Sequence, residues 1–169
     1  LQFFNNQFAS QQQPAPQWLT PQPKNNVVNY RYPYATPEGG VVVLKASYRQ
    51  IPMYYHLSPQ GVQTKIDVKD IGYEDYYSYR NGRIVYTALQ PDKRWGNRDY
   101  SVVRIMDVAT RNITTLQPKT KLFSPDIDSA GQTIVAVEVP AGGQPSLRWY
   151  STTGDSLYTR YLPDVYLLS

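Results

Sequence analysis

The chain has 169 residues, of which 41% are hydrophobic, so it is long and apolar enough to bury a core of its own. It contains no Cys, which excludes disulfides, thiol nucleophiles and thiolate metal sites. Its net charge of +4 arises from 17 cationic and 13 acidic residues spread along the sequence, without the dense basic patch typical of nucleic-acid binding.

The composition favours short strands joined by many turns. The chain has 14 Pro and 10 Gly, which interrupt helices, and 16 Tyr, which suit half-buried strands. No apolar run approaches the roughly 20 residues needed to span a bilayer. Residues 1–13 lack the basic start and apolar core of a signal peptide. The first residue is not Met, and we expect a processed protein or a piece of a longer one.

Residues 1–26 differ from the rest, because Gln, Asn and Pro dominate them. We interpret this stretch as a loose or wrapping N-terminal arm. The alternative is the tail of a preceding β unit, with residues 18–20 as its last strand.

From Val27 the sequence is predicted to form three similar units, at 27–70, 71–121 and 122–169. Each unit has four strand-like stretches separated by turn residues. The predicted strands are 27–32, 41–44, 53–57 and 62–66, then 73–79, 84–88, 102–107 and 113–116, then 123–127, 133–139, 147–150 and 157–161.

The turn glycines Gly39, Gly82 and Gly131 give the repeat its period, since they are 43 and 49 residues apart. A period of about 40–50 residues with four strands per unit is typical of β-propeller blades. The second strands are apolar on both faces, as expected for strands covered by neighbouring blades. A plain β-sandwich remains the alternative, because strands every 8–12 residues suit both folds.

The third unit carries the most specific pattern. Ser124-Pro125-Asp126, then Gly131 and Ile134 to Val137, resembles the core of the TolB-type propeller repeat. That repeat also builds the propellers of prolyl oligopeptidases and dipeptidyl peptidases. The resemblance implies blades of four antiparallel strands and no particular chemistry.

The other units depart from this pattern. In the third unit itself, residues 128–131 stand where the family has an Asp-Gly pair. The first unit has Thr36 to Gly39 at the corresponding place, and the second unit lacks the Ser-Pro pair. Three units are also fewer than the 4–8 blades of a closed ring. We therefore predict an all-β, incomplete or fragmentary propeller.

No residue constellation indicates a reaction. There is no nucleophile elbow, phosphate loop or dinucleotide fingerprint. The single His56 lacks identifiable triad partners, and we interpret it as a packed histidine. Asp126 and Asp128 precede Gly131 as in a calcium loop, but the required Glu is missing, so we interpret them as turn residues. We predict no catalytic, cofactor-binding or metal-binding residues.

The acidic stretch at the junction of the first two units has Asp67, Asp70, Glu74 and Asp75. Paired carboxylates can hydrolyse glycosides. Nothing in the surrounding sequence predicts a pocket that would raise a carboxyl pKa, so we interpret the stretch as a solvated connection.

The candidate functional element is the loop from Gln90 to Tyr100, whose length the fold does not require. Its candidate binding residues are Lys93, Arg94, Trp95, Arg98 and Tyr100. Trp and Arg are enriched in interface hot spots, and loops on rigid β scaffolds commonly bind partners. The alternative is an internal clamp, with Trp95 packed on its own blade and Arg98 paired with Asp92 or Asp99.

These observations favour a non-catalytic binding or scaffold module of a larger exported bacterial protein, located in the periplasm, at the cell surface or outside the cell. A protein or peptide is the expected partner. Two alternatives are a propeller that gates a peptidase domain elsewhere in the parent protein and a carbohydrate-binding propeller. Nucleic acid is disfavoured.

Overall fold

The computed structural model describes residues 18–21, 25–116 and 120–163. These residues form twelve strands in three antiparallel sheets of four strands each, and they contain no helix. The strands are β1 (Val28–Ala35), β2 (Val41–Ser47), β3 (Gln50–Leu57), β4 (Gln63–Val68), β5 (Tyr77–Arg80), β6 (Arg83–Pro91), β7 (Asp99–Asp107), β8 (Ile113–Leu116), β9 (Lys121–Ile127), β10 (Thr133–Val139), β11 (Ser146–Ser151) and β12 (Ser156–Tyr161).

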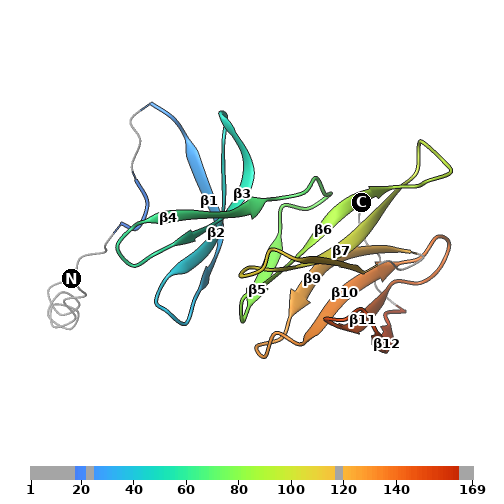
Figure 1. The fold of residues 1–169 in the computed structure, drawn as a ribbon. Helices are drawn as coiled ribbons and strands as arrows, with labels where there is room; N and C mark the ends of the chain where they lie inside the picture. Colours follow the sequence, from blue (N-terminus) through green and yellow to red (C-terminus); the bar gives the residue numbers. More distant parts are fainter. Residues whose placement is uncertain (1–17, 22–24, 117–119, 164–169) are drawn as a thin grey trace, which may run out of the picture.

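Each sheet is built from four consecutive strands in sequence order. The sheet of β5–β8, called the middle sheet below, lies between the first sheet (β1–β4) and the third sheet (β9–β12), and the three fan out as successive blades (Figure 1). This arrangement confirms the predicted propeller blades. It excludes the β-sandwich, in which two sheets share one core.

The turn glycines adopt the conformation that the repeat requires. Gly39, Gly82 and Gly131 all have positive φ angles, of 81°, 74° and 70°. Asn81 also has a positive φ, of 47°, so Asn81-Gly82 forms the tight two-residue hairpin typical of this dipeptide. Glycine accepts this left-handed conformation without the steric cost that a Cβ atom imposes.

The core has two parts, one on each face of the middle sheet. The first part joins the first and middle sheets around fully buried tyrosines, and the second joins the middle and third sheets through aliphatic residues. The first part contains Val42, Leu44, Tyr54, Ile66, Tyr77, Tyr79, Ile84, Tyr86, Ala88, Val102 and Met106, and the second contains Val85, Val103, Ile105, Leu116, Leu122, Ile127, Ile134, Ala136 and Tyr150.

Asp126 was interpreted from sequence as a turn residue, and this interpretation is wrong. Ser124, Pro125 and Asp126 lie inside β9, at a shift in the register with β10. Ser124 has a φ of 45° there. Tyr32-Pro33 occupies a similar shift in β1, where Tyr32 has a φ of 51°. An X-Pro pair inside a strand therefore marks a bulge, which frees the proline from donating a ladder hydrogen bond.

The prediction that every second strand is covered on both faces holds for β6 and for residues 42–44 of β2, but not for β10. Five consecutive residues of β6 are buried, whereas buried and half-buried residues alternate along β10. One face of β10 packs on the middle sheet, and no sheet within the described residues covers the other. Most of the predicted N-terminal arm, residues 1–17 and 22–24, lies outside the described residues, and residues 18–20 do not form a strand.

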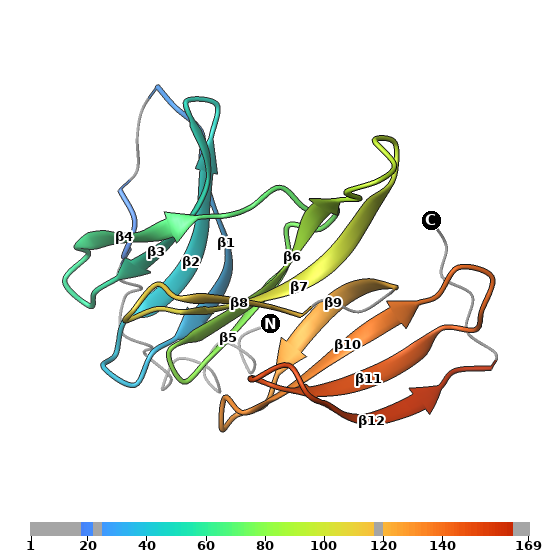
Figure 2. The ribbon, with the colours of Figure 1, turned by 45° about the vertical axis from the view of Figure 1, so that its right-hand side comes forward.

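The strand directions give the array two different ends. At one end, called the turn end, the connections are 36–40, 58–62, 81–82, 108–112, 128–132 and 152–155. At the other, called the loop end, are the connections 48–49, 92–98 and 140–145 together with the segment 69–76 that links the first sheet to the middle one. The loops at 92–98 and 140–145 extend beyond their sheets in Figure 2.

Candidate protein-binding loop

The candidate loop joins β6 to β7, which are the longest strands of the middle sheet. The two strands pair continuously from Arg83 opposite Asp107 to Pro91 opposite Asp99, so the loop is reduced to residues 92–98. The loop begins where the regular hydrogen-bond ladder between β6 and β7 ends. A rigid two-stranded stem therefore presents the loop at the loop end of the array.

The side chain of Asp92 organises the loop from within. Its Oδ1 atom accepts hydrogen bonds from the backbone N–H groups of Arg94, at 2.7 Å, and Trp95, at 3.2 Å. The Arg98 N–H group donates to the Trp95 carbonyl at 3.0 Å, and the Asp92 N–H group donates to the Arg98 carbonyl at 2.8 Å. Such an Asx turn satisfies backbone groups that no strand partner reaches. The hydrogen bond from the Arg94 N–H group lowers the pKa of Asp92 below its usual value, and the bond from the Tyr100 hydroxyl adds a smaller effect in the same direction.

Tyr100 connects the loop to the core. Its hydroxyl donates to Asp92 Oδ2 at 3.0 Å, while its ring packs against the first part of the core. The same hydrogen bond raises the pKa of Tyr100, because the anionic carboxylate stabilises the protonated phenol. The guanidinium of Arg98 lies over the Tyr100 ring, 5.1 Å from its centre, in cation–π geometry.

The remaining candidate residues face solvent. Trp95 is 62% exposed, and Lys93 and Arg94 are exposed as well. The internal clamp considered from sequence, with Trp95 packed on its own sheet and Arg98 paired with Asp92 or Asp99, is therefore not observed. Trp95 is exposed, and Arg98 stacks on Tyr100. Among the described residues, none of the three ion pairs involves this loop. The loop combines an ordered backbone with an exposed indole and unpaired cations.

The other residues singled out in the sequence have structural contacts. His56 lies against Gly40, where a Cβ atom would come within 2.4 Å of the imidazole Nε2 atom. Asp128 caps the turn at 128–132, because its Oδ1 atom accepts from the N–H groups of Gln132, at 2.7 Å, and Thr133, at 3.0 Å. Asp126 instead accepts a hydrogen bond from the Ser78 hydroxyl of the middle sheet.

The acidic connection was interpreted as solvated, whereas its side chains join neighbouring elements. Asp70 pairs with Arg104 at 2.6 Å and accepts from the Tyr86 hydroxyl at 2.7 Å. Asp75 pairs with Arg31 of β1 at 2.6 Å. Glu74 accepts from the hydroxyl and backbone N–H of Ser124, at 2.6 and 2.8 Å. These three carboxylates therefore join the connection to neighbouring elements: Asp70 to the middle sheet, Asp75 to the first sheet and Glu74 to the third sheet.

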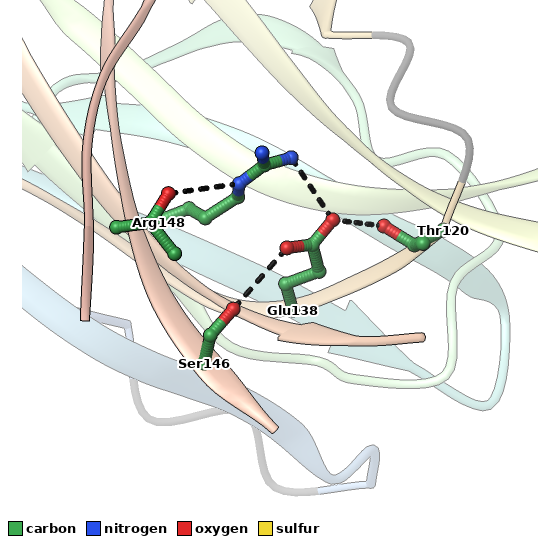
Figure 3. Close-up of polar contacts among 5 residues, drawn as sticks. Thr120, Glu138, Ser146 and Arg148 are labelled. Atoms are coloured by element: carbon green, nitrogen blue, oxygen red, sulfur yellow. Dashed lines mark hydrogen bonds and ion pairs between the residues drawn. The ribbon is translucent and has the colours of Figure 1, made fainter. Parts of the chain in front are cut away.

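Sequence reasoning missed a polar cluster at the loop end of the third sheet. Glu138 is only 8% exposed, and its carboxylate accepts from Arg148 at 3.0 Å, from Ser146 at 3.2 Å and from Thr120 (Figure 3). Both carboxylate oxygens therefore have hydrogen-bond partners, and the cluster links Thr120, β10 and β11. A Glu inside the apolar run of β10 was the available signal for a buried partner.

Within the described part of the chain, no group of three or more His, Asp or Glu side chains is arranged to hold a metal ion. The same residues include no helix of the length and hydropathy needed to cross a membrane.

Comparison with known proteins identifies the class of fold. No family model matches the chain, and no curated protein matches its sequence. Among solved structures, the chain is similar to a puromycin hydrolase S511A mutant complexed with PGG, with a TM-score of 0.56 and 12% identity over 82% of the chain. It is also similar to TolB from Acinetobacter baumannii, with a TM-score of 0.54 and 18% identity over 73% of the chain.

These matches confirm the TolB-type propeller fold that the repeat pattern predicted. The chain spans 21% of the length of the hydrolase and 30% of the length of TolB. At this level of identity the likeness shows the fold alone.

Proposed function

We propose that the chain is part of a non-catalytic β-propeller that binds a protein or peptide partner through the loop at residues 92–98, within an exported bacterial protein of the periplasm or cell surface. The observation that carries the proposal is the exposed Trp95 on a backbone fixed by Asp92. An aromatic side chain on a preordered backbone contributes binding area at a reduced entropic cost.

The charge of the loop suggests the chemistry of the partner. Lys93, Arg94 and Arg98 are exposed and take part in none of the ion pairs found among the described residues. The Asp92 carboxylate is occupied by the loop's own N–H and hydroxyl groups. An acidic segment with an apolar side chain fits this surface best, since opposite charges steer association and exclude cationic competitors.

The proposal can be tested with fluorescence anisotropy of short labelled peptides that differ in charge and carry one aromatic residue. We expect acidic peptides to bind best, and Trp95→Ala to weaken binding by roughly tenfold or more, as for a hot-spot residue. Arg94→Ala should weaken binding and reduce its salt dependence.

Lys65→Ala provides a matched control, because Lys65 is an exposed cation of β4 in the first sheet. Equal binding by wild type, Trp95→Ala and Arg94→Ala would contradict the proposal. Circular dichroism of each variant separates lost binding from lost folding.

A second candidate is a propeller that gates access to a hydrolase domain of the same parent protein. The similarity to a puromycin hydrolase, of which this chain spans only 21%, supports it. Reading the coding sequence on both sides of the chain would test it, since this function requires a hydrolase domain there.

A further inference from the structure

The connection from β4 to β5, residues 69–76, lies at the loop end and is fixed against β6. The Ile71 carbonyl accepts a hydrogen bond from the Leu89 N–H group of β6 at 2.8 Å. Gly72 lies so close to the same strand that a Cβ atom there would come within 2.7 Å of the Thr87 carbonyl oxygen. The connection therefore lies along the part of β6 that leads into the candidate loop.

A buried lysine holds the connection from within. Lys69 is only 7% exposed, and its Nζ atom donates to the Glu74 carbonyl at 2.8 Å and to the Asp70 carbonyl at 3.3 Å. The side-chain carboxylates of the same two acidic residues are bonded to the third and middle sheets. The backbone on both sides of residues 71–73 is thus tied down, as Asp92 ties down the candidate loop, and an ordered backbone lowers the entropic cost of binding.

Between these fixed points the connection exposes apolar side chains. Ile71 is 81% exposed and Tyr73 is 56% exposed. A single exposed apolar residue needs no explanation, but Ile71 shares the loop end with the exposed Trp95, and both stand on an ordered backbone. Three residues of extended chain lead from Leu89, beside Ile71, to Asp92 at the start of the loop, a distance of about 10 Å. The connection and the candidate loop are therefore neighbouring parts of one surface.

The charges around this surface favour an acidic occupant. Lys93, Arg94 and Arg98 lie on the candidate loop. On the other side of the connection, the Nζ atom of Lys121 in β9 lies over the Tyr73 ring, 5.5 Å from its centre. None of these four cations takes part in the three ion pairs found among the described residues. The carboxylates of the connection, by contrast, are bonded within the molecule, so the surface attracts negative charge at both of its ends.

We propose that the acidic partner segment binds in an extended form and places a second apolar side chain on Ile71 and Tyr73, besides the one that contacts Trp95. This inference rests on the proposed function of the candidate loop and adds a spacing rule to it. Side chains four residues apart in an extended segment point to the same side and lie about 13 Å apart. That spacing matches the separation of about 10 Å from Leu89 to the start of the loop, extended by the loop itself.

The test uses the full chain and labelled acidic peptides of equal length and charge, with fluorescence anisotropy as the readout. One peptide carries a single phenylalanine, and three carry two phenylalanines that are two, four or eight residues apart. We expect the pair at a spacing of four to bind about tenfold more tightly than the single phenylalanine, because a second large apolar side chain leaves water. The other two spacings should give a smaller gain.

Matched variants separate the two parts of the surface. Ile71→Ala should remove most of the gain from the second phenylalanine and leave the affinity for the single-phenylalanine peptide unchanged. Trp95→Ala should weaken the binding of both peptides. Val62→Ala is the control and should change neither, because Val62 is a 62% exposed apolar residue in a connection at the turn end of the first sheet. Circular dichroism establishes that each variant is folded.

Equal affinity for one and two phenylalanines at every spacing would overturn the inference, and so would equal affinities of Ile71→Ala and Val62→Ala for the peptide with a spacing of four. Either result leaves the proposed function standing if Trp95→Ala still weakens binding, whereas no binding of any peptide would contradict both. Wild-type binding to phosphatidylglycerol vesicles, or self-association in sedimentation velocity, that Ile71→Ala removes without a change in peptide affinity would also overturn the inference. The occupant would then be an anionic lipid surface or a second copy of the chain.

Discussion

Strands β6 and β10 have similar sequences and the same place in their sheets, yet they differ in burial. Each begins its apolar run with a fully buried isoleucine, Ile84 or Ile134, that packs toward the preceding sheet. The next residue, Val85 or Val135, points the other way, and of the two only Val85 is covered by another sheet of the described residues. For this pair of strands, the apolar Ile-Val sequence is the same, and the presence of a sheet against the outer face determines whether the second apolar residue is buried.

The largest expected effect is on Val85. We predict that Val85→Ala lowers the free energy of unfolding by about 2–3 kcal/mol, since it removes two carbon atoms and leaves a cavity between two sheets. Val135→Ala at the matching place should cost less than about 1 kcal/mol, because that side chain is already half in water. Urea unfolding of both variants measures the difference, and equal losses would contradict the comparison.

A somewhat smaller effect is expected at the turn glycines. A Cβ atom at Gly131 would lie 2.9 Å from the Cβ atom of Asn81 in the middle sheet, whereas one at Gly82 would meet nothing within 4 Å. Both residues have positive φ, so Ala should cost about 1–2 kcal/mol at either one. We predict a larger loss for Gly131→Ala, because it also disturbs the contact between two sheets. Thermal unfolding of the two variants side by side tests this ranking.

A third prediction concerns acid stability. The pKa of Asp128 is lower in the folded protein than its ordinary value, through the N–H groups of Thr133 and Gln132. Its stabilisation is therefore fully present above the unfolded pKa, near 4, and is lost as the pH falls through the folded pKa. The matching turn of the first sheet is capped by Thr36, whose hydroxyl accepts from the Gly40 N–H at 3.1 Å and does not titrate.

Asp128→Thr should therefore keep a cap and weaken the loss of stability as the pH falls below about 4. Urea unfolding at pH 7 and in steps below pH 4 measures the slope. An unchanged acid dependence would show that Asp128 does not contribute to it.

The smallest effect is expected in the candidate loop. Trp95 belongs to the middle sheet's long hairpin but needs no neighbouring sheet, because it is 62% exposed. Trp95→Ala should change the free energy of unfolding by less than about 0.5 kcal/mol. A large loss of unfolding free energy in a urea titration would contradict this prediction and would indicate that Trp95 acts as an internal clamp.

Much of the fold could be predicted because its signals are local. Asn81-Gly82 specifies a tight hairpin whatever surrounds it, and strand-turn periodicity places the second strands within a few residues. The candidate loop could be predicted from the sequence for the same reason, because this stretch is longer than a hairpin requires. Its internal order was not, because the roles of Asp92 and Tyr100 depend on a hydrogen bond between side chains eight residues apart.

The contacts between sheets could not be predicted from the sequence in the same way. The bond from Ser124 to Glu74 joins residues 50 positions apart, and the Arg31–Asp75 pair joins residues 44 positions apart. No local pattern indicates such a partner.

By itself, the sequence determined the units, the turns and the alternation of apolar strands, because backbone preferences and hydrophobic periodicity act over a few residues. The tertiary structure alone decided which apolar face is covered, which carboxylates are occupied and which aromatic side chains remain available. Those properties depend on the packing of one sheet against the next, and the free energy of burial follows the area that a neighbour removes from water.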